Sequence, residues 1–380
     1  MKDSKTVVHI STVHNPEDPR IFHKECQTLK KAGFDVRFIV STTEETKPNS
    51  DVKIIPLKKY KNKLSRMLFS TIEAYRKARK QKADYYHIHD PELLPVAWLL
   101  KTKRNVVIYD IHEDYETSIM QKEYLPKFLR KFIANAYKMV EQAFSKNLEL
   151  CLAEKYYKEK YPRGTCILNY PILNKTMMNR ERKSTTIDSP LLYTGNLSVE
   201  RGALIHATLP RIDERLFVYF YGRCPQKLAT KMYEIAGNKK EQLKLKGIDQ
   251  YVPKKEIDDA YMSQSWLAGI ALFPPTEHYM RKELTKFFEY MSAGIPIVCS
   301  NFPVWKDFVE KYSCGLVVDP YDENQIKKVI EYLRENPNEV KKMGNNGKKA
   351  VQSELNWEKE GEKLVVWYNE IWERKYKFGE

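Results

Sequence analysis

Three polar segments in the first third of the chain place histidines beside carboxylates. They are residues 14–25, residues 86–94 (Tyr-His-Ile-His-Asp-Pro-Glu-Leu-Leu) and residues 110–114 (Asp-Ile-His-Glu-Asp). Histidine titrates near pH 7 and therefore suits proton transfer with a hydroxyl group or a hydrogen bond to one. In a strand, His87 and His89 point to the same side, so a metal pair completed by His112 and Glu113 is the alternative. We expect no metal, because a catalytic zinc site needs three well-placed ligands and an open position.

Two segments in the second half combine glycine, a basic residue and the start of a helix. Residues 194–202 (Thr-Gly-Asn-Leu-Ser-Val-Glu-Arg-Gly) follow an apolar run, and Arg201 adds a positive charge to this turn. In residues 283–298, Thr285 is predicted to cap a short helix that ends at Gly294. Free amides at a helix start suit a phosphate group. Glu289 lies one turn further on, where its carboxylate suits ribose hydroxyls; an ion pair or a solvent-facing role is the alternative for this glutamate.

The elements that position these segments alternate between short apolar runs and helical patterns. The apolar runs are continuous, which is typical of parallel strands covered on both faces. Strands are predicted at residues 7–10, 36–40, 85–88, 106–109, 191–193, 217–221, 243–245, 266–273 and 295–299. Helices are predicted at residues 22–32, 65–80, 93–100, 125–144 and 357–372, with a second long basic helix before Cys166. The pattern predicts two α/β sheets in tandem.

A polar stretch at residues 173–189 separates the two series of strands and is predicted to be a linker. It divides the chain into domains at residues 1–172 and 190–359. Ligands of doubly wound sheets bind at the carboxyl ends of the strands. We therefore expect one cleft where the carboxyl ends of the two sheets face each other, lined by the polar segments described above.

Composition narrows the class of protein. A length of 380 residues with 42% hydrophobic and 30% charged residues indicates a globular chain of two domains. The longest apolar candidate, residues 93–100, is too short to cross a bilayer, and residues 7–10 are too short for a signal-peptide core. Six scattered cysteines are predicted to be free thiols in the cytoplasm. The net charge of +15 indicates an anionic partner, but no zinc-finger spacing or RNA-binding sheet motif supports nucleic acid.

One segment of the second half resembles a known family. Residues 287–296, Phe-Phe-Glu-Tyr-Met-Ser-Ala-Gly-Ile-Pro, are similar to the K-L-F-E-Y-M-A-A-G-x-P signature of GT-B glycosyltransferases related to glycosyltransferase family 4. Residues 193–195 resemble the first strand and turn of the family's second domain, and Trp357-Glu358 resembles the start of its last helix. The resemblance implies two Rossmann-like domains facing across a cleft. It also implies that a final helix, about residues 360–380, returns to the first domain.

The resemblance also implies where the donor binds. Glu289 is expected to bind the ribose. The backbone at Thr285 and Lys286 is expected to bind the diphosphate, and Tyr251 is expected to lie beside the base. The full set of expected donor residues is Gly195, Asn196, Arg201, Gly202, Tyr251, Val252, Thr285, Lys286 and Glu289. The chain departs from the family at two of its positions: Arg281 replaces the first acid of the E-x7-E pair, and Asn196 stands where an arginine is frequent.

In the first half, residues 87–91 resemble the family's H-x-H-[DE]-P, whose second histidine faces the reacting sugar. His89 is therefore the expected catalytic residue. The remaining residues expected to line the cleft and hold the acceptor are His14, Arg20, His23, Asp90, Glu92, His112 and Glu113. For His14, Arg20 and His23, packing behind the site is the alternative.

These features predict a glycosyltransferase that moves a sugar from a nucleotide diphosphate, UDP favoured over GDP, to a glycan or lipid-linked acceptor of the cell envelope. The resemblance implies retention of configuration without a metal or other cofactor. Basic residues mixed with apolar ones at residues 58–82 and 127–139 predict docking on an anionic membrane surface, with solvated helix faces as the alternative. A nucleotide-sugar epimerase or hydrolase, or a subunit that binds nucleotide sugar without turnover, are the competing functions.

Overall fold

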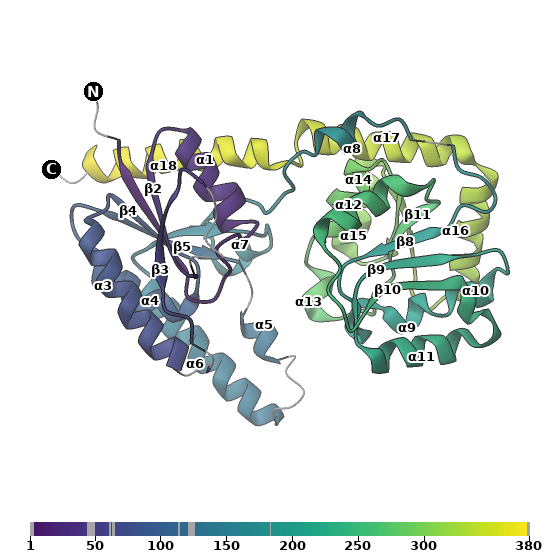
Figure 1. Ribbon diagram of the computed structural model, residues 1–380, viewed down its shortest axis with the longest axis horizontal. Helices are drawn as coiled ribbons and strands as arrows, with labels where there is room; N and C mark the ends of the chain where they lie inside the picture. Colours follow the sequence, from purple (N-terminus) through teal and green to yellow (C-terminus); the bar gives the residue numbers. More distant parts are fainter. Residues whose placement is uncertain are drawn as a thin grey trace. The chain divides into compact units, whose positions relative to one another are not determined.

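The chain forms two compact units in a computed structural model (Figure 1). The first comprises residues 1–169 and 357–380, and the second comprises residues 170–356. The structure describes residues 4–43, 50–60, 62, 65–112, 115–120, 126–182 and 184–377. None of the helices in these described ranges is long and apolar enough to span a lipid bilayer.

The first unit is built on a sheet of seven parallel strands in the order β3-β2-β1-β4-β5-β6-β7. The strands are β1 (Thr6–Ile10), β2 (Asp35–Ser41), β3 (Lys53–Leu57), β4 (Tyr85–Ile88), β5 (Val106–Ile111), β6 (Glu149–Leu152) and β7 (Thr165–Cys166). The strand order reverses between β1 and β4, and His9 lies opposite His87 in this pair. Ligands of doubly wound sheets bind outside the carboxyl ends at such a point. The loops that follow β1, β4 and β5 meet there.

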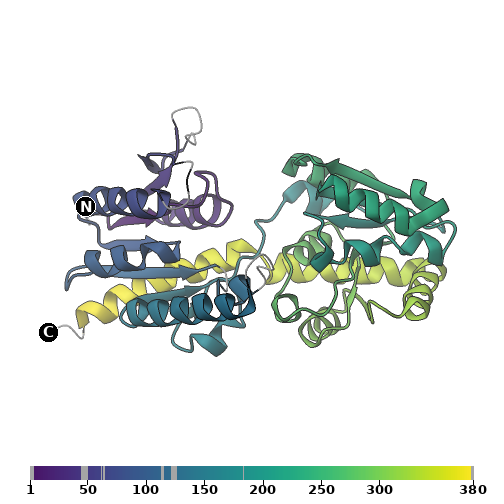
Figure 2. The same ribbon diagram turned by 90° about the horizontal axis from the view of Figure 1, so that it is seen from below.

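Helices cover both faces of this sheet (Figure 2). One face packs on η1 (Ile21–Cys26, π-helical), α1 (Gln27–Lys31) and α18 (Trp357–Lys377). The other packs on α3 (Thr71–Gln81), which follows η3 (Arg66–Ser70), and on α4 (Leu94–Leu100), α6 (Lys127–Ser145) and α7 (Tyr157–Lys160). The connections also contain η4 (Pro91–Leu93) and α5 (Tyr115–Met120). Both layers are needed because the strands are apolar on both sides.

The helix α18 completes the apolar core of the first unit although it is the last helix of the chain. Tyr368 accepts a hydrogen bond from Tyr85 Oη at its backbone oxygen (2.8 Å), and its own hydroxyl lies 2.7 Å from His87 Nδ1. Trp357 Nε1 donates to Thr28 Oγ1 at 2.9 Å. The side chains of α18 therefore reach the centre of the sheet.

The second unit has six parallel strands in the order β10-β9-β8-β11-β12-β13. They are β8 (Leu191–Thr194), β9 (Val218–Cys224), β10 (Leu243–Ile248), β11 (Ala268–Ala271), β12 (Ile297–Ser300) and β13 (Gly315–Val318). The helices are α8 (Lys175–Asn179), α9 (Ala203–His206), α10 (Leu209–Ile212), α11 (Gln226–Ala236), α12 (Lys254–Ser263), α13 (Glu277–Met280), α14 (Thr285–Ser292), α15 (Pro303–Tyr312), α16 (Glu323–Glu335) and α17 (Pro337–Ser353), with the 3-10 turns η5 (Val199–Arg201) and η6 (Gly237–Gln242). The order reverses between β8 and β11, so the loop after β8 lies at the switch point.

The predicted fold class, two doubly wound α/β domains, is confirmed. The long basic helix predicted before Cys166 is wrong, because this segment forms β6, the four-residue α7 and β7. Leu150, Cys151 and Leu152 are buried in the sheet, but in the sequence their apolar run is short and stands between Glu149 and Glu154. Residues 173–189, the predicted linker, lie in the second unit. There Arg182 donates to backbone oxygens of Gly294 (3.0 Å) and Trp266.

Candidate active site

The loop after β1 is tied to the loop after β4 by two carboxylates. Asp90 is fully buried, and its Oδ2 accepts hydrogen bonds from Ser11 Oγ (2.9 Å) and the backbone nitrogen of Thr12 (2.7 Å). Glu92 Oε1 accepts from Thr12 Oγ1 at 2.6 Å. His14 lies in the same loop, with Nδ1 3.0 Å from Asp18 and Nε2 3.5 Å from Asp90. Asp90 and Glu92 therefore fix the loop that carries His14.

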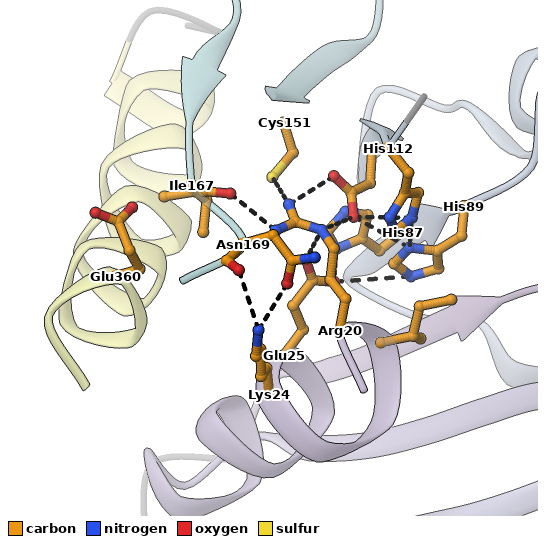
Figure 3. Close-up of polar contacts among 12 residues, drawn as sticks. Arg20, Lys24, Glu25, His87, His89, His112, Cys151, Ile167, Asn169 and Glu360 are labelled. Atoms are coloured by element: carbon orange, nitrogen blue, oxygen red, sulfur yellow. Dashed lines mark hydrogen bonds and ion pairs between the residues drawn. The ribbon is translucent and has the colours of Figure 1, made fainter. Parts of the chain in front are cut away.

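Three imidazoles, those of His9, His89 and His112, form a hydrogen-bonded row. Figure 3 labels the last two. His9 Nδ1 lies 2.9 Å from His89 Nε2, and His89 Nδ1 lies 3.0 Å from His112 Nε2. Burial lowers the pKa of His89, and it lowers that of His112 to about 3, so both rings are neutral at pH 7. The side chain of His112 is 11% exposed and that of His89 is fully buried. A ligand that approaches this row meets His112 before His89.

Arg20, which precedes η1, supports the row of histidines through its buried ion pair with Asp110. Its Nε and Nη2 donate to the two oxygens of Asp110 at 3.0 and 2.8 Å, and its Nη1 donates to the oxygen of Ile167 at 2.9 Å (Figure 3). Although burial opposes the charged form, Arg20 and His112 hold the pKa of Asp110 well below its usual range. Asp110 Oδ2 in turn lies 3.1 Å from His112 Nε2. Arg20 is 3% exposed and acts on the loop through Asp110.

Glu25 comes from η1 and faces the histidines of β1 and β4. Its Oε2 lies 3.9 Å from His9 Nδ1 and from His89 Nε2, and 4.0 Å from His87 Nδ1. Burial and the charge of Asp110 raise its pKa well above the usual range. These four side chains have the spacing to hold a metal ion, although His9 and His89 also bond to each other and His87 bonds to Tyr368.

In the second unit, two glycines shape the turn after β8. Gly202 has φ +74°, and a Cβ atom there would lie 1.8 Å from the backbone oxygen of Leu272. Gly195 has φ +96° with open space at its Cβ position. The turn holds Arg201, whose Nε donates to Tyr279 Oη at 2.9 Å and whose Nη1 donates to the oxygen of Asn196 at 3.3 Å. Arg201 is thus fixed over the end of β8.

A cavity of about 240 Å³ opens beside this turn, and Thr194, Gly195, Arg201, Thr285, Lys286 and Glu289 contribute to its wall. Lys286 is 9% exposed, and its ammonium lies 3.5 Å from the centre of the Tyr193 ring. Among the described residues it has no hydrogen-bond partner. Burial and then the charge of Arg201 lower the pKa of Lys286 well below its usual value. The basic side chains of Arg201 and Lys286 therefore converge on one cavity, where a bound anion would favour the charged form of Lys286.

Glu289 lies at the same cavity and is held on both sides. Its Oε1 accepts from Lys254 Nζ at 3.0 Å, and its Oε2 accepts from Tyr261 Oη at 2.7 Å. Tyr261 Oη also lies 2.9 Å from Thr194 Oγ1, so the tyrosine links Glu289 to the end of β8. Lys254 and Tyr261 had no signal in the sequence, because only the fold brings α12 beside α14.

The predicted cap at Thr285 is wrong. Leu284 is the N-cap of α14, with extended backbone angles, and Thr285 is already the first helical residue. The side chain of Thr285 is exposed at the cavity, at the start of α14. In the first turn the amide of Phe287 donates to the oxygen of Leu284 at 2.9 Å, and the amides of Thr285 and Lys286 precede it.

The predicted site residues fall into two groups, one in each unit. Around the carboxyl ends of β1, β4 and β5 the structure brings together His14, Arg20, His89, Asp90, Glu92 and His112. Around the cavity it brings together Gly195, Arg201, Thr285, Lys286 and Glu289, and Asn196 and Gly202 belong to the same turn.

Four predicted residues are not part of these groups. His23 is exposed on η1 and packs edge-on against Phe22. Tyr251 is 77% exposed and Val252 is buried, and neither lines the cavity. Glu113 lies outside the described residues. The sequence reasoning missed His9, whose signal is a polar residue inside an apolar strand, and gave no role to Glu25.

Two sequence models of known families match the chain. The model described as Glycosyltransferase Family 4 matches residues 7–154, and the model described as Glycosyl transferases group 1 matches residues 285–350. Together they cover more than half of the chain. The chain is a GT-B glycosyltransferase.

Solved structures share the fold of this glycosyltransferase at low sequence identity. Sucrose-phosphate synthase from Thermosynechococcus elongatus has a TM-score of 0.73 at 16% identity, over 97% of this chain and 99% of that one. A glycosyltransferase from Rickettsia africae has a TM-score of 0.72 at 13% identity, over 99% and 100%. HepE from Anabaena, in complex with UDP and glucose, has a TM-score of 0.68 at 10% identity, over 96% and 100%. No curated protein sequence matches the glycosyltransferase significantly.

The matched regions contain the first group of site residues and part of the second. The family 4 match includes the histidine row and Arg20, and the group 1 match begins at Thr285 and includes Lys286 and Glu289. The switch point of the first unit therefore lies in a matched part of the chain, whereas the turn after β8, with Gly195 and Arg201, lies between the two matches.

Proposed function

We propose that this glycosyltransferase binds a nucleotide diphosphate sugar, UDP favoured, in the cavity of the second unit. The observation that carries the proposal is the buried ammonium of Lys286, which lies beside Arg201 at the start of α14 with no hydrogen-bond partner among the described residues. A buried charge without a partner is costly unless a ligand of opposite charge binds to it. HepE, which shares the fold, has been solved with UDP and with UDP-glucose, and this supports UDP as the nucleotide.

In this proposal the diphosphate accepts hydrogen bonds from Lys286, Arg201 and the first amides of α14. Lys286 supplies the positive charge that Asn196 lacks. Glu289, oriented by Lys254 and Tyr261, accepts hydrogen bonds from the ribose hydroxyls. The base extends toward Tyr251 and Val252 in the loop after β10.

The first unit supplies the groups that meet the acceptor. Glycosyl transfer passes through an oxocarbenium-like transition state in which the bond to the diphosphate breaks as the acceptor oxygen bonds to the anomeric carbon. Lys286 and Arg201 stabilise the charge that develops on the leaving diphosphate. In this proposal the neutral ring of His112 hydrogen-bonds the acceptor hydroxyl or the sugar, and the contacts that support this role are those of His89 and Asp110 with that ring. Following the family resemblance, we expect retention of configuration without an added metal or cofactor.

Thermal unfolding in the presence of UDP, GDP, UDP-sugars and GDP-sugars tests the donor site. A nucleotide present at about 100 times its dissociation constant adds about 2.7 kcal/mol of stability. We expect a shift with UDP compounds that is lost in Glu289→Ala and kept in Lys306→Ala, an exposed lysine on α15. If none of these nucleotides stabilises the wild-type chain, the proposed donor class is wrong.

For the acceptor, we propose a glycan or lipid-linked molecule of the cell envelope, reached from the cytoplasmic face of the membrane. The net charge of +15 supports binding of the enzyme to an anionic membrane surface. Release of UDP from a UDP-sugar that requires added lipid extract, and labelled sugar recovered in the lipid phase, is the expected outcome. Release of free sugar at the same rate without any acceptor would instead indicate a hydrolase.

A further inference from the structure

The helix α6 turns its apolar side away from the protein. Only Ala134, Glu141 and Ser145 of its 19 residues are buried. Three of its large apolar residues are mostly exposed: Phe128 is 76% exposed, Phe132 71% and Met139 72%. An amphipathic helix of a globular protein normally buries its apolar side chains and exposes its polar ones. In α6 Phe144 packs against the core in this way, but Phe128, Phe132 and Met139 do not.

The spacing of these residues makes one continuous stripe. At about 100° per residue, Phe128, Phe132 and Met139 fall within an arc of about 40° on the helix. The buried residues Ala134 and Glu141 fall on the opposite side. Glu141 is satisfied there, because Tyr109 and Tyr137 donate hydrogen bonds to its Oε1 at 3.1 and 2.7 Å. The helix is therefore anchored by its polar side and presents its apolar side to the surroundings.

Two neighbouring elements extend the stripe into a face. The helices α3, α4 and α6 lie side by side on one face of the sheet (Figures 1 and 2). In α4, Trp98 and Leu99 are 59% and 52% exposed. We define the docking face as the exposed apolar residues of η3, α3, α4 and α6, namely Met67, Leu68, Phe69, Ile72, Trp98, Leu99, Phe128, Phe132, Ile133, Met139 and Val140.

The charges around the docking face are mostly positive. The helices α3 and α6 carry eight basic residues and two acidic ones. One of the acids is the buried Glu141, and the other, Glu73, pairs with Lys77 at 2.6 Å. Exposed lysines such as Lys127 and Lys131 flank Phe128 and Phe132. An apolar stripe bordered by lysine and arginine fits the boundary between the acyl chains and the anionic head groups of a bilayer.

We propose that the docking face inserts its apolar side chains into an anionic lipid bilayer while the flanking basic residues contact the phosphate groups. A second copy of the chain is the weaker occupant, because joining two such faces would bring like charges together. The inference rests on the proposed function for its purpose, since docking brings the enzyme to a lipid-linked acceptor. The evidence for it is the exposure of the apolar side chains of the docking face and the positive charge around them.

Vesicle flotation tests the proposal with the full chain at physiological salt. The wild type is expected to float with vesicles of phosphatidylcholine and phosphatidylglycerol. Its binding to vesicles of phosphatidylcholine alone should be weaker by about tenfold or more. The triple variant Phe128→Ala, Phe132→Ala, Met139→Ala and the double variant Lys127→Gln, Lys131→Gln should each lose about tenfold in binding. Tyr321→Ala with Tyr332→Ala, which removes exposed aromatic side chains of the second unit, should bind as the wild type does.

Trp98 provides a second readout because it is exposed, whereas Trp266, Trp305, Trp357 and Trp367 are buried. On anionic vesicles its fluorescence should shift to the blue, and Trp98→Phe should remove most of that shift. Equal binding to both kinds of vesicle, or unchanged binding of the triple variant, would overturn the proposal. So would a dimer that the triple variant abolishes, without any vesicle binding.

The donor site is tested separately from the docking face. All substituted side chains are exposed, so the triple variant should unfold at the wild-type temperature and keep its stabilisation by UDP. Vesicle binding without a nucleotide shift would leave the docking face intact and contradict only the donor class. A nucleotide shift without vesicle binding would do the reverse.

Discussion

Replacing Lys286 with methionine should change the affinity for the nucleotide and the stability of the free protein in opposite directions. The substitution keeps most of the side-chain volume and removes the charge. In the free protein the ammonium is buried without a hydrogen-bond partner among the described residues, at a cost that the ring of Tyr193 offsets in part. Replacing a buried ion pair by apolar side chains is often neutral or stabilises by about 1–4 kcal/mol, and we expect the lower end of that range for this single side chain. Loss of the cation–π contact costs about 2 kcal/mol or less. A net gain of about 1 kcal/mol would raise the unfolding midpoint by about 2–4 °C.

Nucleotide binding should change in the opposite direction. A hydrogen bond to a charged group contributes about 1.5–3 kcal/mol, so Lys286→Met should weaken UDP about 10- to 100-fold. Uridine, which has no phosphate, should bind the variant and the wild type alike. Calorimetric titration gives the affinities, and differential scanning calorimetry gives the midpoint of the free protein.

The pH dependence of stability tests whether the gain in stability of Lys286→Met comes from removing the ionisable group. Burial lowers the pKa of Lys286 in the folded chain, so between that lowered pKa and the usual value of 10.5 the unfolded chain binds the additional proton. Stability of the free wild type should therefore rise with pH in this window, and Lys286→Met should lose that rise. A variant that is less stable than the wild type and binds UDP equally well would refute the reasoning.

Three further substitutions test other parts of the structure. Gly202→Ala places a Cβ atom 1.8 Å from the oxygen of Leu272 at positive φ, and we expect a loss of about 3 kcal/mol or more in urea unfolding. Arg20→Met leaves Asp110 buried without its guanidinium and should cost about 3–5 kcal/mol, most strongly above pH 4, where the carboxylate is charged in the unfolded chain as well. His112→Gln should lower kcat/KM about 100-fold or more while leaving the UDP affinity unchanged, as measured by UDP release and by titration.

Each of these substitutions has a matched control in the chain. Gly33→Ala also lies at positive φ but meets no atom within 4 Å, so it should cost less than Gly202→Ala. Arg223→Met and His23→Gln change exposed side chains and should leave stability and activity near the wild type. A His112→Gln enzyme with normal turnover would move the acceptor chemistry to another residue. An Arg20→Met protein of normal stability would show that the buried pair is dispensable.

The sheets were predictable because their strands are short, continuous apolar runs followed by polar turns, as in β4 and β8. The strands β3, β6 and β13 were not predicted. In β6 a run of four apolar residues stands between Glu149 and Glu154, and their burial depends on β5 and β7 at either side. The start of α14 was misplaced by one residue, since threonine is a common cap and leucine is not.

The same limit applies to the site. The sequence indicates that His87 and His89 share one side of a strand, but not that β1 lies next to that strand and places His9 against them. The sequence therefore does not indicate which of the three histidines lies nearest the surface, whereas in the structure this is His112. Glu289 was predicted as a ribose ligand from a motif, whereas its two supports, Lys254 and Tyr261, depend on the packing of separate helices.

The position of α18 has a consequence for the order of synthesis. The apolar core under one face of the first sheet includes Leu364, Trp367, Tyr368 and Ile371 of this helix. A ribosome that adds about 5–20 residues per second needs on the order of 10–40 s to pass through the second unit after finishing residue 169. During that time η1 and α1 are present but α18 is not, so part of one face of the first sheet stays uncovered. When α18 is finally made, the second unit already has all of its strands. The nascent chain should therefore complete its second unit first, and chaperones that bind apolar surface should find their target on the first.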